Sequence, residues 1–145
     1  MITKMRNKDV YMGVQQVTRF AGRDVPFKIS YACGKSLVRL REQFDLIESE
    51  RQKIIKKCQA KDPDGTPLTK KVTDARGQVI EVPTFEDDSV VGEDLAALQA
   101  MEVEIDVHSV KLGVWDELMQ KAKIDVSSDE MAALIKLGIL IDSEV

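Results

Sequence analysis

The feature that most constrains the fold is a run of positions whose spacing alternates between four and three residues. The run comprises Cys33, Leu37, Leu40, Phe44, Ile47, Arg51, Ile54 and Cys58, in which Arg51 is the single charged residue. Apolar residues that repeat every three and a half positions predict a long α-helix that packs along one seam, as in a coiled coil. We therefore expect a helix over residues 27–61, which follows Pro26 and ends before Pro63.

Turn signals follow this helix. Residues 61–67 place an Asp-Gly pair between two prolines, and the next Gly-containing connection, residues 74–77, lies between two β-branched runs. This pattern predicts a β-hairpin over residues 68–82. Two short polar strands are marginally stable in water, so the hairpin is either braced by another segment or a mobile tip.

A second helix is predicted over residues 89–101, where Val91, Leu95, Leu98 and Met101 recur at helical spacing. The simplest topology folds this shorter helix back antiparallel on the long one, with the β-hairpin at the far end of the pair. Part of the seam then stays uncovered unless another chain covers it.

The remaining segments complete an α+β fold that is mainly helical. Residues 102–112 alternate as a half-buried strand with one slip, and its candidate partners are residues 2–5, residues 27–29 or the neighbourhood of Val25. A short helix is expected over 7–21, capped by Asn7, and short helices over 114–140, with a capping box from Ser127 to Glu130. We predict one domain, 1–145: an antiparallel helical hairpin with a β-hairpin at its tip, a small sheet at its base and short C-terminal helices.

Composition agrees with one globular domain outside the membrane. The chain is 43% apolar but only 5% aromatic, so the core is expected to be aliphatic. The most apolar stretch, Met131–Ile141, is far shorter than the roughly 20 residues of a membrane span and contains Lys136. Cys33 and Cys58 would lie roughly 37 Å apart on one helix, too far for a disulfide. We expect two reduced thiols and a cytoplasmic protein.

The sequence contains no recognisable catalytic, metal or cofactor motif. His108 is the only histidine, and it shares one side of the predicted strand with Glu104 and Asp106, so we expect it to be solvated or ion-paired. There is no Cys-X-X-Cys pair and no glycine-rich phosphate loop. We expect neither enzymatic activity nor a cofactor.

Charge is divided unequally along the chain. Residues 1–76 contain 17 Lys and Arg against 9 Asp and Glu, whereas residues 77–145 contain 4 against 16. These opposite charges either neutralise each other within the fold or leave a dipolar molecule that associates head to tail or binds a charged partner. The basic residues that cluster toward the predicted tip form a candidate interaction surface: Lys53, Lys56, Lys57, Lys61, Lys70, Lys71 and Arg76. Interleaved acids, scarce aromatics and a pI of about 5.1 argue against nucleic-acid binding.

Three stretches carry a resemblance to a known family: residues 28–32 (KISYA) leading into the charged heptad helix, residues 61–67 (KDPDGTP), and residues 95–107 with the motif at 103–108 (VEIDVH). Over residues 26–140 the chain resembles small uncharacterised proteins encoded by tailed phages and prophages. The segment before Val25 and the hairpin at 68–82 depart from that family's plan. The resemblance implies a phage-encoded protein in the host cytoplasm, and it transfers no catalytic residues.

Two functions remain open. The first is a non-enzymatic structural or interaction protein, associated with the virion or its assembly, that binds a protein partner or itself through its seam and charged faces. The second is a soluble inhibitor or sequestering protein that binds a host factor or small ligand through the basic residues at the tip.

Overall fold

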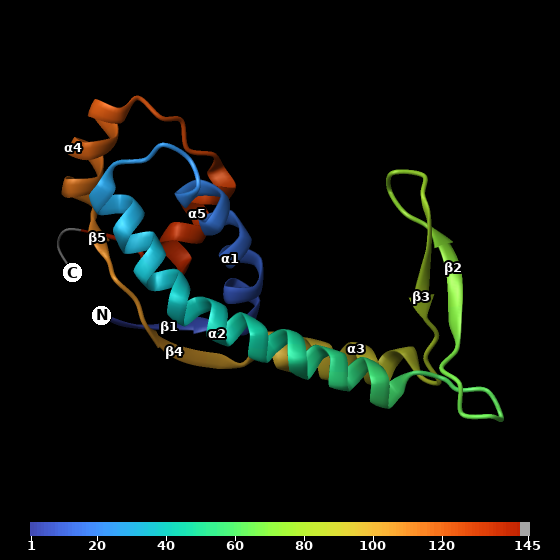
Figure 1. The fold of residues 1–145 in the computed structure, drawn as a ribbon. Helices are drawn as coiled ribbons and strands as arrows, with labels where there is room; N and C mark the ends of the chain where they lie inside the picture. Colours follow the sequence, from blue (N-terminus) through green and yellow to red (C-terminus); the bar gives the residue numbers. More distant parts are fainter. Residues whose placement is uncertain (143–145) are drawn as a thin grey trace. The chain divides into compact units, whose positions relative to one another are not determined.

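The computed structural model describes residues 1–142 and confirms the mainly helical α+β class (Figure 1). Where the sequence predicted one domain, the structure has two compact units. Unit 1 contains Met1–Ile47 and the chain from Gln99 onward, and unit 2 contains Glu48–Leu98. The two units are described separately below.

The sheet of unit 1 pairs β1 (Ile2–Arg6) with β4 (Glu102–Asp106) in antiparallel register, Ile2 opposite Asp106 and Arg6 opposite Glu102. Strand alternation buries Met5 and Ile105 on one face. Of the candidate partners for the acidic strand, the N-terminal segment is therefore confirmed. The alternative at residues 27–29 is wrong, because these residues begin a helix.

Helix α1 (Asn7–Ala21) follows β1 directly and has the predicted range. Asn7 is not its cap as predicted. Arg6 holds that position, and its backbone N–H donates to the carboxylate of Asp9 at 3.2 Å. Asn7 is buried instead, with its backbone N–H donating to the carbonyl of Met101 at 2.9 Å and its side-chain oxygen accepting from Gln43 at 2.9 Å.

Helix α2 (Phe27–Cys58) begins where predicted but ends three residues before residue 61. Gln59 and Lys61 leave the helix because they form antiparallel bridges with Phe85 and Pro67. The part of α2 in unit 1 buries one stripe of residues: Ile29, Ala32, Cys33, Ser36, Leu37, Leu40 and Ile47. That stripe contains the first half of the predicted seam.

The strand predicted over 102–112 is two strands. After β4 ends at Asp106, β5 (Val110–Lys111) pairs in parallel with β6 (Leu140–Ile141). Between β4 and β5 the backbone is bound by a side chain of α2: the hydroxyl of buried Ser36 accepts from the N–H of His108 at 2.9 Å and donates to its carbonyl at 3.2 Å. A serine 72 residues away therefore replaces the strand partner at this point.

Helices α4 (Leu112–Ala122) and α5 (Ser128–Lys136) account for most of the predicted range 114–140, although α4 begins two residues earlier. The unpredicted strand β6 starts at the last residue of that range, Leu140. The predicted capping box of α5 is confirmed. The backbone N–H of Ser127 donates to the Glu130 carboxylate at 3.1 Å, and that of Glu130 donates to the Ser127 hydroxyl at 3.1 Å. Buried Glu130 also lies 3.4 Å from the guanidinium of Arg23.

Gly138, between α5 and β6, is expected to tolerate no side chain. Its φ of +74° is unfavourable for other residues, and a Cβ there would overlap the side chain of Thr3. We expect Gly138→Ala to lower the free energy of unfolding by about 2–4 kcal/mol, from backbone strain and overpacking together. Gly34→Ala is the matched control, because a Cβ at this helical position would meet nothing within 4 Å beyond its chain neighbours and the backbone of its own helix. Urea denaturation should show the control unchanged or more stable by up to about 1 kcal/mol; equal effects would contradict the expectation.

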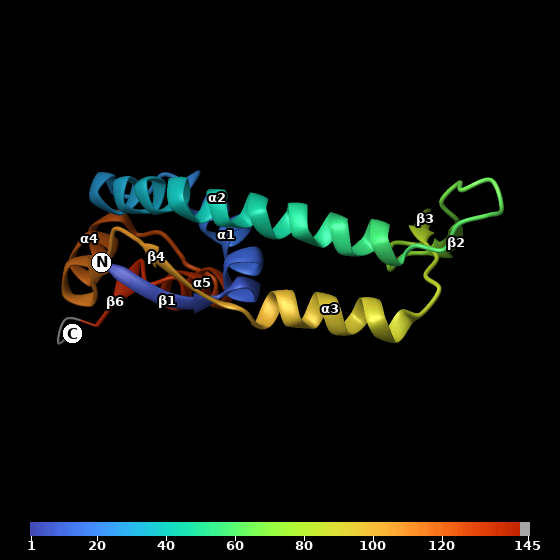
Figure 2. The same ribbon diagram turned by 90° about the horizontal axis from the view of Figure 1, so that it is seen from below.

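Unit 2 contains the end of α2, the hairpin of β2 (Thr69–Thr73) and β3 (Val79–Pro83), and most of α3 (Asp88–Ala100). The C-terminal part of α2 and α3 run antiparallel along each other in this unit (Figure 2). In the hairpin, Lys71 lies opposite Glu81. The turns at Gly65 and Gly77 both use positive φ angles, of +83° and +79°.

A ring of three backbone hydrogen bonds braces the hairpin. Ala60 N–H donates to the carbonyl of Thr84 at 2.7 Å, Thr84 N–H to Leu68 at 3.0 Å, and Leu68 N–H to Ala60 at 2.8 Å. The end of α2, the start of β2 and the end of β3 are thus joined at one point. Of the two alternatives that the sequence left open, the structure has the braced hairpin, and the brace is made by the main chain.

Unit 2 has almost no buried core. All of residues 48–98 are described, and Val91 is the only one of them that is buried, at 6% exposure. Ile54, Leu95 and Leu98 are half-buried. The order of this unit therefore rests mainly on helical and backbone hydrogen bonds rather than on buried apolar area.

Candidate functional site

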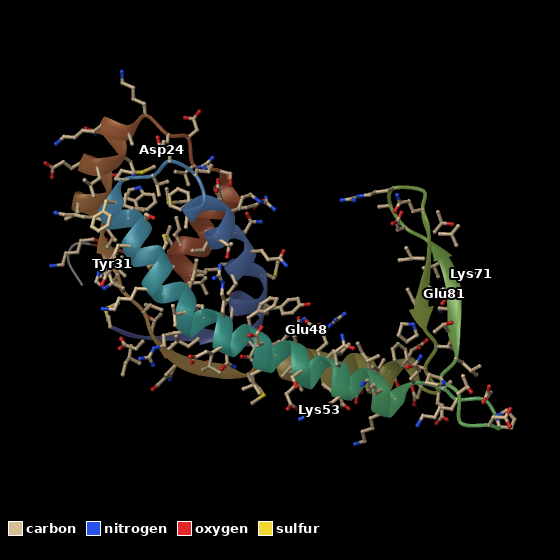
Figure 3. All side chains as sticks on the ribbon, viewed as in Figure 1. Asp24, Tyr31, Glu48, Lys53, Lys71 and Glu81 are labelled. Carbon is tan, nitrogen blue, oxygen red and sulfur yellow. The ribbon has the colours of Figure 1, made fainter. Side chains whose placement is uncertain are left out.

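The seven residues of the predicted basic surface all belong to unit 2 and are all exposed. Lys53 pairs with Glu50 at 3.0 Å, and Lys71 faces Glu81 across the hairpin (Figure 3). Unit 2 as a whole contains 8 Lys and Arg against 11 Asp and Glu, counted over residues 48–98. The cations are accessible, but they lie among carboxylates and do not make this unit basic.

The two parts of the predicted seam lie in different environments. Its first part, through Ile47, belongs to the core of unit 1, where half-buried Phe44 stacks on Tyr11 with centroids 5.1 Å apart. In unit 2, Arg51 forms an ion pair with Glu48 at 3.3 Å on the same helix, and Ile54 and Cys58 are half-buried. Most of the seam is therefore a packing element and not an open docking surface.

The two cysteines of the seam should differ sharply in reactivity. Cys33 is buried, and burial raises the pKa of its thiol to about 12, whereas Cys58 is half-exposed. Since the thiolate is the reacting species, we expect iodoacetamide to alkylate Cys58 in the native protein and Cys33 only after unfolding. Mass spectrometry of the alkylated protein measures this directly; early modification of Cys33 would show that its burial is wrong.

The structure reveals an exposed apolar stripe on α2 that we did not predict. Phe27, Tyr31 and Val38 are 79%, 52% and 61% exposed. Gly34 lies between them, and a Cβ there would meet nothing within 4 Å beyond its chain neighbours and the backbone of its own helix. Spacings of four, three and four place these residues on one helical face, opposite the buried stripe of the same helix. The sequence signal for this stripe is a second apolar period, offset from the seam.

Tyr31 is the centre of an aromatic group on this face, and it is labelled in Figure 3. The ring of Phe27 lies 6.0 Å from it, that of His108 meets it edge-on at 5.7 Å, and the ammonium of Lys35 lies 5.8 Å from its centroid. The backbone of His108 is held by its two hydrogen bonds to Ser36. His108 is exposed as expected, and its ring contacts the aromatic ring of Tyr31.

Two neighbouring hollows flank the Tyr31–His108 contact, and both are lined by His108 and Ser109. One, of about 290 Å³, is lined by Phe27, Tyr31 and Val114 together with two lysines, Lys28 and Lys111. The other, of about 400 Å³, is lined by Lys35, Arg39 and Asp106. Cationic side chains therefore surround the exposed apolar ones.

Asp106 is the carboxylate among these cations, and it already has a partner within the chain. Its Oδ1 accepts a hydrogen bond from the Met1 ammonium at 2.8 Å. This hydrogen bond and the charge of the same ammonium, followed by the charges of Arg39 and Lys35, hold the pKa of Asp106 below its ordinary value.

The term aromatic surface is used below for these exposed apolar side chains and the cations around them. It comprises Phe27, Tyr31, Val38 and Val114 with Lys28, Lys35, Arg39 and Lys111.

The aromatic surface is a group of exposed apolar side chains with cations around it. Within residues 1–142 no group of three or more His, Cys, Asp or Glu side chains is placed to hold a metal ion. In the same range, no helix has both the length and the apolarity to cross a bilayer. No protein-family model, curated protein or solved structure matches this chain.

Proposed function

We propose that this chain is a non-enzymatic, phage-encoded interaction protein with a structural role in the virion or its assembly. The observation that supports the proposal best is the aromatic surface. Exposed apolar side chains are ordinary when they are scattered, but a contiguous group framed by charge is characteristic of a protein-binding site.

The geometry of the aromatic surface suits binding. Its main side chains project from one regular helix, so their backbone positions do not have to be ordered when a partner arrives. Tyr31 presents a large ring with few rotatable bonds, a property common in the residues that dominate interface energies. Cations around an apolar centre resemble the polar rim of a typical interface.

The experiment is mass spectrometry of purified particles of the phage that encodes the chain. The wild-type protein should be recovered in the particles or in their assembly intermediates, and Phe27→Ser/Tyr31→Ser should be depleted at least tenfold. Met12→Ser/Ile135→Ser is the matched control, because Met12 and Ile135 are 71% and 56% exposed in unit 1 but lie outside the aromatic surface. Absence of the wild-type chain, or equal incorporation of all three proteins, would overturn the proposal.

A second candidate function is an inhibitor or sequestering protein that binds a host factor through the exposed cations of unit 2. The observation in its favour is that Lys70, Lys71 and Arg76 are all exposed along one hairpin. Reversing all three charges to Glu should abolish capture of an acidic partner from host lysate. Lys8→Glu/Arg19→Glu/Lys121→Glu is the control, because it changes the net charge equally at exposed sites of unit 1. Equal recovery of partners by both variants would contradict this function.

A further inference from the structure

We infer that the aromatic surface of one chain binds the outer face of α3 of a second copy, so that chains join head to tail. The inference rests on the proposed function, because it names the partner of the same surface. Two requirements follow from the aromatic surface itself: its partner must present a narrow apolar face, and it must carry carboxylates beside that face.

Helix α3 and the residues just before it carry five carboxylates. Glu86, Asp87, Asp88, Glu93 and Asp94 lie in or just before it, and the sequence contains no Lys or Arg between Arg76 and Lys111. A helix without cations has no internal partners for these carboxylates at i+3 or i+4. The two sides of the contact therefore carry opposite charge.

The outer face of α3 also has the required shape. Val90, Glu93, Asp94 and Ala97 recur at spacings of three and four residues and are all exposed, Val90 at 44%. Val91, Leu95 and Leu98 form a separate, inner face roughly 120° around the helix, and this face is buried or half-buried. The outer face thus combines small or medium apolar side chains with two carboxylates, and these four residues are called the acidic face below.

The acidic face is shorter than the stripe of the aromatic surface, so it fits within the length of that stripe. At 1.5 Å per residue, the acidic face extends for roughly 10 Å and the stripe from Phe27 to Val38 for roughly 16 Å. Gly34 permits close approach of the partner backbone, and the small side chain of Ala97 suits that position. Glu93 and Asp94 would then lie beside Lys28 and Lys35. Because these charges are exposed, they determine how the two helices align and make the association depend on salt, but they add little to the affinity between the chains.

The contact is heterologous, since the aromatic surface belongs to unit 1 and the acidic face to unit 2. A pair of chains joined in this way retains one free aromatic surface and one free acidic face. Such association either closes into a ring or continues as a filament. Both outcomes suit a structural protein that must form a repeating assembly.

Sedimentation velocity with complementary variants tests the inference. Phe27→Ser/Tyr31→Ser removes the aromatic surface, and Val90→Ser/Glu93→Gln/Asp94→Asn removes the acidic face. We expect the wild-type sedimentation coefficient to rise with protein concentration and each variant alone to remain monomeric. An equimolar mixture should form a one-to-one dimer and nothing larger, because each variant retains only one of the two faces. The control Met12→Ser/Ile135→Ser should associate as the wild type does.

The salt dependence of association is a second measurement. A melting temperature equal to that of the wild type shows that each variant is folded. Raising the salt from 50 to 500 mM should weaken wild-type association about tenfold, since the exposed charges are screened. A monomeric wild type, or a mixture that stays monomeric, would overturn the inference. A wild type that is monomeric but enters particles through Phe27 and Tyr31 would overturn only this inference. A chain that associates head to tail but is absent from particles would overturn only the proposed function.

Discussion

Phe20→Ala is expected to lower the free energy of unfolding of unit 1 by about 3–5 kcal/mol, the range for removing a large aromatic side chain from a packed core. Phe20 has no exposed surface, and its ring stacks on Trp115 with centroids 5.5 Å apart. The guanidinium of Arg23 lies 5.6 Å from the same ring. The substitution therefore removes buried area, an aromatic pair and a cation–π contact together.

Urea denaturation followed by Trp115 fluorescence measures this loss, because Trp115 is the single tryptophan and lies in unit 1. Met12→Ala is the control: Met12 belongs to the same helix but is 71% exposed, so its loss should cost less than about 0.5 kcal/mol. A Phe20→Ala protein as stable as this control would show that the described core of unit 1 is wrong.

The second large effect is a difference in hydrogen exchange between the units. The amides of β2 and β3 are expected to exchange roughly a thousandfold faster, or more, than those of α2 between Ile29 and Ile47. The reason is the contrast in burial: α2 contributes seven buried residues to unit 1, whereas Val91 alone is buried across residues 48–98. Few apolar contacts have to be broken when the hairpin opens.

Exchange measured by mass spectrometry on peptides from residues 69–83 and 29–47 makes this comparison within one sample. Removing the brace provides an internal control. Leu68→Pro deletes the N–H that donates to the carbonyl of Ala60 and should accelerate exchange in the hairpin while leaving residues 29–47 unchanged. Equal protection of the two segments in the wild type would contradict the account of unit 2.

The parts of the fold that local patterns determine could be predicted from the sequence. The heptad period identified α2, two β-branched runs around a Gly-containing connection identified the hairpin, and Ser127 with Glu130 identified the start of α5. Each of these depends on residues close in sequence, where spacing and side-chain chemistry leave few alternatives.

The errors lie where distant residues decide the structure. The strand predicted over 102–112 is interrupted because the hydroxyl of Ser36, on α2, binds the backbone of His108. The pairing of β5 with β6 joins residues 110 and 140, and neither two-residue strand has a periodic signal of its own. Two compact units were also invisible, because one unbroken helical period runs through both of them.

The candidate site shows the same limit. A helix with two apolar stripes leaves open which stripe is buried, and only tertiary packing determines that the stripe through Leu37 is core while the one through Tyr31 is exposed. The basic residues of unit 2 were predicted as a cluster from their density in the sequence. The turns and the strand pairing then placed acids such as Glu81 among them.

The central claim is that the aromatic surface is a contact surface, and site-specific photo-crosslinking tests it most directly. A photoreactive phenylalanine analogue at position 31, in the cells that naturally produce the protein, should give a discrete cross-linked species. The same analogue at position 12, which is more exposed than position 31 but lies outside the aromatic surface, should give at most a tenth of that yield. Equal yields at the two positions, or no cross-linked species at position 31, would contradict the account.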